Sequence, residues 1–408
     1  MRNNALGYVA IGVAKATEIG GRVTADKVEC GLRAGSGSET LGRLGRYSLL
    51  GIAIALLPMP PALAADDNHG QVVPIQSSTV PSNGDGNPYG VAFVPKDFPS
   101  GGAVKPGDIL VSNFNNSVPI QGTGTTIIRL TPNSQVAPSG SASVFFQGTT
   151  PPPLGLTTAL GVLKRGFVVV GSVPTTDGTF NTIQPGSLLI LDRNANIVAT
   201  LTNATLLDSP WDLTIQDGGD SAKVFVSNVV SGTVTRLDLA IISGKPAVMG
   251  TTQIVKGYTV KPNAGAVILG PTGLAYDAER DILYVASTAD NAIFKVLNAG
   301  RITQPVIRGT IIFQDDHLRG PLALVLAPNG DLITSNGDAV NADPTQPSEI
   351  VEFTKEGKEG KFIGQFSIDS VLGSAFGIAI VPAGEDSVRL AAVDDSRNDI
   401  TVFRLSTQ

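Results

Sequence analysis

The sequence predicts an all-β protein that folds as a six-bladed β-propeller, with the last blade closed by an N-terminal strand. The first observation is composition, because 47 Gly, 27 Pro and only 16% charged residues indicate many short strands joined by tight turns. The second is a motif that returns six times, and the third is a final unit that ends one strand short. We expect residues 1–64 to be a leader, 65–86 a tail that supplies the closing strand, and 87–408 the propeller.

Each repeat unit opens with a short motif, and four of the six motifs carry proline at their second position. The motifs are Asn87–Ala92, Thr157–Val162, Ser209–Thr214, Gly270–Ala275, Gly320–Val325 and Ser374–Ala379. A turn and a β-rich run follow each motif: Ile109–Asn113, Phe167–Ser172, Val224–Asn228, Ile282–Ser287, Leu332–Asn336 and Val388–Asp394. A third run alternates as a half-buried strand does: Thr126–Leu130, Leu188–Asp192, Val234–Asp238, Ile293–Val296, Ile350–Phe353 and Ile400–Leu405.

The sixth unit lacks a fourth strand of its own. Five units have a looser fourth run, such as Val144–Gln147, but the sixth reaches Gln408 without one. A propeller closes its ring of sheets and protects its edges, so a strand must come from elsewhere in the chain. We predict that Val72–Gln76 pairs with Ile400–Leu405.

The fourth unit carries the clearest repeat signature. It reads Gly270-Pro271-Thr272-Gly273-Leu274-Ala275-Tyr276-Asp277, followed by Asp281–Ala286 and Asn291–Ile293. This unit resembles an NHL repeat of the secreted bacterial type, and the resemblance extends over residues 87–408. The average unit of about 54 residues is longer than a WD-type blade. The resemblance implies a six-bladed propeller and no single activity, because this architecture hosts binding proteins, lactonases and lyases.

The N-terminal segment has the layout of a secretory signal. Arg43 and Arg46 precede an apolar run over 49–57, and the small-residue sequence Ala62-Leu63-Ala64 follows. The apolar run is about half the ~20 residues that a spanning helix needs. We therefore expect cleavage after Ala64 and a secreted or periplasmic protein with no membrane span after cleavage.

Charge and cysteine content restrict the partners. Without residues 1–64 the chain keeps 22 Lys and Arg against 31 Asp and Glu, a net charge near −9, which argues against nucleic acid. The sole cysteine, Cys30, lies in the leader, so the mature chain would need no disulfide. We expect a monomer whose partner is a small molecule, a glycan or a protein.

The loops that precede the innermost strands, here called the leading loops, share one face of a propeller with the loops between second and third strands. We expect a ligand on this leading face. The candidate ligand-binding residues there are Tyr89, Asn113, Trp211, Asp212, Asn228, Asp316, His317, Arg319, Asn336 and Asp395. They follow from topology and not from a catalytic motif.

Each candidate also has a structural interpretation. Asn113, Asn228 and Asn336 recur at equivalent points, as residues that cap turns do. Tyr89 and Trp211 occupy the same motif position, which indicates packing against a neighbouring blade or, alternatively, an aromatic rim for a sugar or other flat ligand.

The run Asp315-Asp316-His317 with Arg319 is the densest titratable cluster and is compatible with a general base, a metal site or a solvated loop.

A calcium ion is the one cofactor that the sequence suggests. Asp338, Asn341 and Asp343 lie close together in a long loop and offer the oxygen ligands that Ca²⁺ prefers, although their spacing is not that of an EF-hand.

Three functions remain open from the sequence. The leading one is an exported binding or interaction module, and the alternative is a metal-assisted lyase or hydrolase with a cation in the central channel. The third is a purely structural surface protein.

Overall fold

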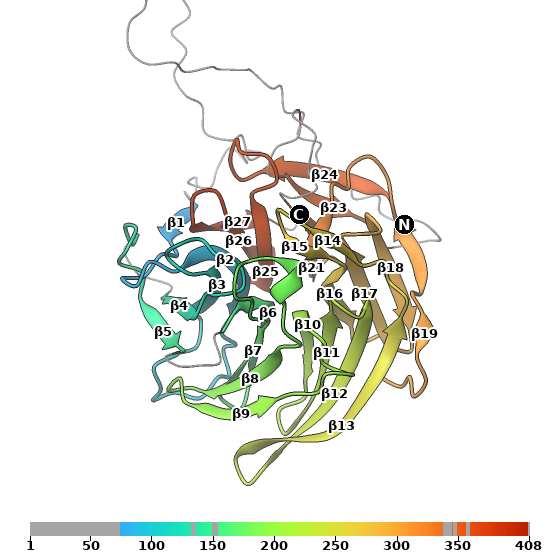
Figure 1. The fold of residues 1–408 in the computed structure, drawn as a ribbon, viewed down its shortest axis with the longest axis horizontal. Coiled ribbons are helices and arrows are strands. Elements are labelled where there is room, and N and C mark those ends of the chain that lie inside the picture. The colour runs from blue at the N-terminus through green and yellow to red at the C-terminus, as the bar shows by residue number, and fades with distance from the viewer. Residues whose placement is uncertain are drawn as a thin grey trace, which may run out of the picture. The chain divides into compact units, whose positions relative to one another are not determined.

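The computed structural model of the protein describes residues 74–131, 136–148, 154–337, 345, 349–355 and 360–406. In these residues the chain is almost entirely β-structure, with one 3₁₀ turn, η1 (Phe180–Thr182). Six sheets are arranged as the blades of a propeller, which confirms the predicted fold class (Figure 1). No helix among these residues has the length and apolar character to cross a bilayer. The expected leader lies outside them.

The first three blades follow one another along the chain. Blade 1 consists of β2 (Gly86–Phe93), β3 (Ile109–Asn115), β4 (Thr126–Leu130) and β5 (Val144–Gln147). Blade 2 consists of β6 (Leu156–Leu163), β7 (Phe167–Ser172), β8 (Ser187–Asp192) and β9 (Ile197–Leu201). Blade 3 consists of β10 (Pro210–Asp217), β11 (Ser221–Asn228), β12 (Thr233–Ile242) and β13 (Lys245–Lys256).

The last three blades repeat this order. Blade 4 consists of β16 (Pro271–Asp277), β17 (Ile282–Ser287), β18 (Ala292–Leu297) and β20 (Thr310–Phe313). Blade 5 consists of β21 (Pro321–Leu326), β22 (Leu332–Asn336), β23 (Glu349–Phe353) and β24 (Phe362–Ser367). Blade 6 consists of β25 (Ala375–Pro382), β26 (Ser387–Asp394), β27 (Asp399–Ser406) and the N-terminal β1 (Ile75–Ser78).

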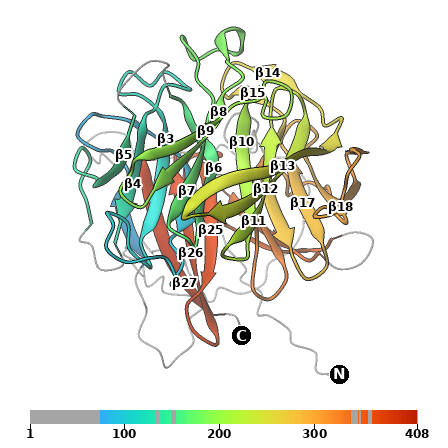
Figure 2. The same cartoon turned by 90° about the horizontal axis from the view of Figure 1, so that it is seen from below.

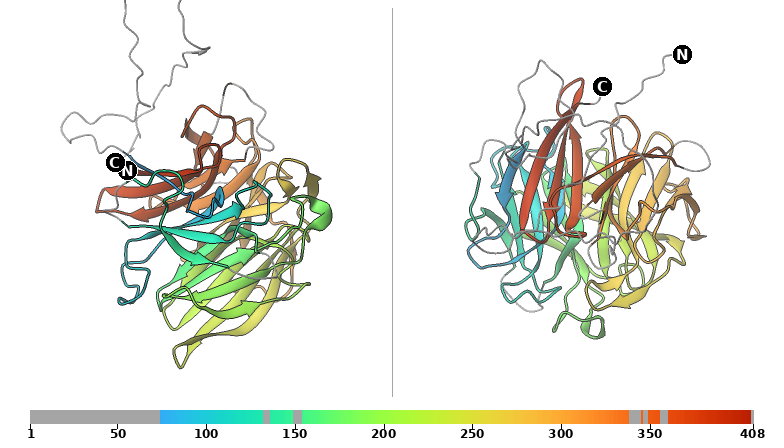
Figure 3. Two further views of the ribbon diagram at one scale, coloured as in Figure 1. Left: turned by 60° about the vertical axis from the view of Figure 1, so that its left-hand side comes forward. Right: turned by 90° about the horizontal axis from the view of Figure 1, so that it is seen from above.

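The N-terminal strand closes the ring as predicted. β1 runs antiparallel to β27, and Ile75 pairs with Val402 while Ser78 pairs with Asp399. In Figure 3 the red strands of the last blade lie beside the blue start of the described chain. The pairing extends two residues beyond the predicted Gln76, and Val72 lies outside the described residues.

The hydrophobic core consists of layers between neighbouring blades. Alternate side chains of each sheet meet those of the next, as Leu110 and Leu160 do between blades 1 and 2. Another layer joins blades 6 and 1 through residues such as Val111 and Val393. Lys355 of blade 5 also donates to Asp277 of blade 4, with 2.8 Å between Nζ and Oδ2, and both side chains are buried. The blades are therefore held to one another mainly by apolar packing.

Two additions to the sheets depart from the simple repeat, and blade 2 differs in register. The hairpin β14 (Lys261–Asn263) and β15 (Val267–Leu269) lies between blades 3 and 4 along the chain. β19 (Val306–Ile307) leaves blade 4 and adds a parallel fifth strand to β13.

In blade 2, Leu156 pairs with Ser172 as Pro88 pairs with Asn113. Leu156, and not Thr158 as the repeat comparison suggests, takes the place of the proline. The sequence comparison misplaces it because β6 carries one more residue before regular pairing resumes at Leu160.

Candidate ligand-binding channel

The centre of the leading face, where the sequence predicts a ligand, is filled by aromatic side chains. Tyr89 and Trp211 are only 4% and 1% exposed. The Tyr89 ring stacks on Phe114 with 4.9 Å between centroids and meets Phe376 edge-on at 4.9 Å. Trp211 packs edge-on against Tyr89 at 5.9 Å and against Phe114 at 5.5 Å. These four rings, called the aromatic plug below, belong to the core, so Tyr89 and Trp211 do not form a rim.

Two further segments cover the aromatic plug. Val267 and Ile268 of β15 are buried in the same cluster, and Phe180 and Ile183 at η1 pack against it. Figure 2 shows β14 and β15 at one end of the propeller. The Gln121 side chain secures their hairpin from blade 1 by donating to the Gly265 carbonyl at 2.6 Å. Within the described residues, the centre of the leading face is thus closed.

The three candidate asparagines anchor the leading loops of their own blades. The side-chain amide of Asn113 donates to the Thr79 carbonyl at 3.0 Å, and that of Asn336 donates to the His317 carbonyl at 3.0 Å. Asn228 makes the same bond to Leu206 at 3.2 Å. All three side chains are buried at the ends of second strands. This shared geometry is what recurrence in the repeat predicts, since a buried amide must find partners.

The candidate cluster in blade 5 forms an exposed leading loop. His317 Nδ1 lies 3.1 Å from Asp315 Oδ1, and its ring stacks on Phe362 at 3.7 Å between centroids. Asp316 is exposed, while the backbone N–H of Arg319 donates to Asn336. Asn336 and Phe362 of the same blade and Asn291 of blade 4 hold this loop in place.

The remaining candidates are separated from these. Asp395, half-buried in the β26–β27 turn, donates its backbone N–H to Ser374 at 2.9 Å. Asp338, Asn341 and Asp343, proposed for calcium, lie outside the described residues. Across the part of the chain that the structure describes, no three His, Cys, Asp or Glu side chains gather in a manner suited to a metal ion.

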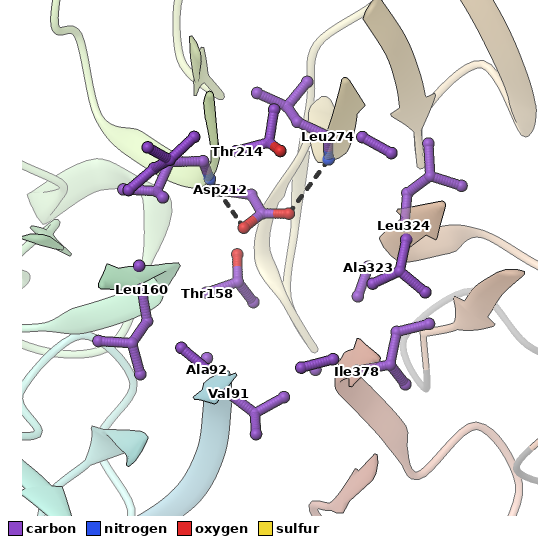
Figure 4. Close-up of a pocket in the computed structure, with 18 of the residues that line it drawn as sticks. Val91, Ala92, Thr158, Leu160, Asp212, Thr214, Leu274, Ala323, Leu324 and Ile378 are labelled. Carbon is purple, nitrogen blue, oxygen red and sulfur yellow. Dashed lines mark hydrogen bonds between the residues drawn. The ribbon is translucent and has the colours of Figure 1, made fainter. Parts of the chain in front are cut away.

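A cavity of about 410 Å³ follows the propeller axis below the aromatic plug. Its walls come from the innermost strands of all six blades. Most of the lining side chains are apolar, with Val91, Ala92, Leu160, Leu274, Leu324 and Ile378 among them (Figure 4), while polar atoms make up more than half of the exposed lining surface. In β10, β21 and β25 the first four residues are buried, whereas those toward the turn into the second strand are half-exposed. The channel is therefore closed at the leading face and opens at the opposite end.

Asp212 carries the one carboxyl group among the described residues that line this channel. Its Oδ1 accepts the Leu213 N–H at 2.8 Å, and its Oδ2 accepts the Leu274 N–H of blade 4 at 3.2 Å (Figure 4). Burial raises the pKa of Asp212 well above its usual range, although both backbone hydrogen bonds favour the ionised form. Asp212 thus combines a polar anchor with an apolar enclosure, which is the usual composition of a small-molecule pocket.

Asp212 occupies a position where the other blades carry small residues. The fourth residue of the repeat motif, which is Asp212 in blade 3, is Gly90 in blade 1, Gly273 in blade 4, Ala323 in blade 5 and Gly377 in blade 6. Here each strand approaches the next blade closely, and a Cβ at Gly377 would overlap the Tyr89 carbonyl oxygen. At this position in blade 3 the Asp212 carboxyl group instead accepts a hydrogen bond from β16 of blade 4. The channel wall therefore departs from the repeat pattern at this point.

Replacing Asp212 by Asn should remove a pH-dependent part of the stability. Between the ordinary pKa of an aspartate and its raised native pKa, the folded protein holds a proton that the unfolded chain releases. The free energy of unfolding should therefore fall as pH rises through this window, by up to about 1.4 kcal/mol per pH unit. Urea titrations of both proteins from pH 4 to 9 measure this.

Asp212→Asn loses one backbone hydrogen bond at every pH, so a constant loss of stability is expected. The titration of Asp212 is measured by how the difference in unfolding free energy between wild type and variant changes with pH. A difference that stays constant with pH would show that Asp212 titrates normally.

Two hydroxyl-bearing neighbours of Asp212 were not among the sequence candidates. Thr158 and Thr214 line the channel beside it, and Thr158 Oγ1 donates to the Trp211 carbonyl (Figure 4). In the sequence, only their position could have indicated them, because both lie on innermost strands close to Asp212 or in its neighbouring blade. A threonine in a strand is ordinarily a packing residue, so its type alone gave no indication.

Fold and channel together define a six-bladed β-propeller with an apolar central pocket. The chain matches no protein-family model and no curated protein. Among solved structures, it is similar to a gluconolactonase from Xanthomonas campestris, with 11% identity over 81% of this chain and 90% of that one, TM-score 0.49. A periplasmic gluconolactonase from Pseudomonas aeruginosa has 15% identity over 78% and 85%, TM-score 0.41. With TM-scores below 0.5, neither similarity assigns a family or an activity to this chain, and the NHL-repeat resemblance stays a prediction.

Proposed function

We propose that this protein is a binding module that takes a small molecule into its central channel, from the end opposite the leading face. The observation that carries the proposal is a buried carboxyl group, Asp212, in a cavity of about 410 Å³ whose other lining side chains are mostly apolar. Pockets of this size and composition are typical of sites for small ligands. The proposed site lies in the channel and not on the leading face where the sequence predicted it, but Asp212 belongs to both.

The lining side chains favour a small molecule over a glycan or a protein, because few of them carry polar groups. A sugar presents many hydroxyl groups that would need polar partners, and burying them unpaired costs free energy. The narrow axial channel also admits a small ligand more readily than a protein surface. We retain export as part of the proposal, supported by the signal-like residues 43–64.

Binding is better supported than the metal-assisted alternative. A central cation would need oxygen ligands from several blades. Among the described residues Asp212 supplies the one carboxyl group of the lining, and Asn113, Asn228 and Asn336 bond to leading loops instead. No described group in the channel supplies the set of ligands that this chemistry requires.

Fluorescence of N-phenyl-1-naphthylamine, a neutral apolar probe, tests the proposal. We expect saturable binding to the wild-type protein and to a Thr214→Val variant, since valine preserves the shape of the side chain. Thr214→Trp should abolish binding, because Thr214 lines the channel and an indole would obstruct it. Melting curves of both variants establish that they are folded. Equal binding by Thr214→Trp, or none by the wild type, would overturn the proposal.

A further inference from the structure

Among the described residues, Asp212 has no cationic partner in the channel. None of the lining residues is Lys, Arg or His, and Tyr89 and Tyr276 are the other titratable groups. The Tyr276 hydroxyl is engaged elsewhere, donating to Asp281 Oδ1 at 2.8 Å. Each carboxyl oxygen of Asp212 accepts one backbone N–H, and a carboxylate oxygen can accept more than one hydrogen bond. The carboxyl group therefore keeps accepting capacity toward the cavity.

A buried carboxyl group without a cationic partner favours a positively charged ligand. An unpaired carboxylate in an apolar enclosure is costly, and here burial raises the pKa of Asp212. A cation that enters the channel stabilises the ionised form, and its charge-assisted hydrogen bond is stronger than one between neutral groups. A neutral ligand gains only the weaker bond, and an anionic ligand meets a like charge.

The rest of the channel lining indicates the chemistry of the ligand beyond its positive group. Leu160, Leu274 and Leu324 surround the space beside Asp212 and offer apolar contact to a hydrocarbon chain or ring. Toward the open end, the Arg389 guanidinium lies over the Phe93 ring, 4.9 Å from its centroid. This arrangement suits one positive group at the inner end and an uncharged end near Arg389.

We propose that the channel selects an organic monocation, a primary or secondary amine with an apolar body, whose ammonium group donates to the Asp212 carboxylate. This inference rests on the proposed function and names the ligand class of the same site. The ion pair would form inside the ring, so binding would depend on the head group more than on the detailed shape of the body.

Displacement of N-phenyl-1-naphthylamine by three matched compounds tests the inference. 4-Phenylbutylamine, 4-phenylbutanol and 4-phenylbutyrate share one body and differ in the head group. At pH 7 the amine should compete about 10- to 100-fold more strongly than the alcohol, as expected for a hydrogen bond to a charged group. The acid should compete least.

Two variants assign the preference to the carboxyl group. Asp212→Asn keeps the side-chain shape, and Asp212→Ala matches the alanine that blade 5 carries at this position. In each variant the amine and the alcohol should compete about equally, when competition is compared with that variant's own affinity for the probe. Two substitutions are used so that one remains informative if the other does not fold.

The outcomes separate the two proposals. If the probe binds and Thr214→Trp blocks it, but the alcohol or the acid competes as well as the amine, the channel is a pocket and the amine inference is wrong. The same holds if Asp212→Asn and Asp212→Ala keep the preference. If the probe does not bind the wild-type protein, or Thr214→Trp does not block it, the proposed function fails and the inference fails with it.

Discussion

Deleting residues 65–80 should lower the melting temperature by about 10 °C. The deletion removes β1 and all four of its paired residues from the edge of β27. It also removes the bond from Gln76 Nε2 to Asp399 Oδ2 at 2.5 Å and two bonds from Thr79 to the Asn398 carbonyl, each 2.9 Å. At about 1 kcal/mol for each hydrogen bond, the loss is on the order of 5 kcal/mol.

The damage should extend beyond blade 6. The Thr79 carbonyl accepts a hydrogen bond from the buried side-chain amide of Asn113. The Val80 carbonyl accepts hydrogen bonds from the N–H groups of Gly140 and Ala142 in blade 1. Without residues 65–80 these groups lose their partners at the junction between the first and last blades.

Circular dichroism melts compare this deletion with a control that removes only residues 65–73 and keeps β1. The control should melt as the chain that begins at residue 65 does. Equal melting temperatures for the two truncations would show that closure contributes little.

Trp211→Ala should destabilise the protein by about 3–5 kcal/mol, the usual result of truncating a large buried aromatic residue. Trp211 is 1% exposed and packs edge-on against Tyr89 and Phe114. Its removal would leave a cavity at the axis, where Tyr89 and Phe114 of blade 1 lose their contacts with the indole ring.

Trp211→Phe is the matched control, because Phe376 occupies the equivalent position in blade 6. We expect it to lose clearly less stability than the alanine variant. Urea unfolding followed by circular dichroism measures both, since Trp211 is the only tryptophan of the chain. A loss below about 1 kcal/mol for Trp211→Ala would contradict its role in the aromatic plug.

The blades could be predicted because the repeat sets both strand order and strand position. The runs predicted over 167–172, 282–287 and 332–336 coincide with β7, β17 and β22. The hairpin β14–β15 and the strand β19 could not be predicted in this way, because each occurs once and has no counterpart in other units. They are stabilised by tertiary contacts, such as that of β19 with β13, which local patterns do not contain.

The site could be predicted only in part. Asp212 follows the sole tryptophan at a motif position where most repeats carry a small or apolar residue, and the structure places it on the channel wall. Its depth in the channel could not be predicted, because the leading loops carry most of the polar residues and the repeat pattern does not show which end of the axis is closed. Closure of that end depends on Val267 and Ile268, which come from an unpredicted hairpin.

The position of β1 also determines when the native ring can form. Gln76 and Asp399, which meet in the closed blade, are 323 residues apart in the chain. Contacts of such long range require closure of a very long loop and are intrinsically slow to form. During synthesis, β1 is therefore made long before its partner β27, and the first blade has no neighbour on that side until then. Ring closure is a late event for this chain, completed only when β27 has emerged.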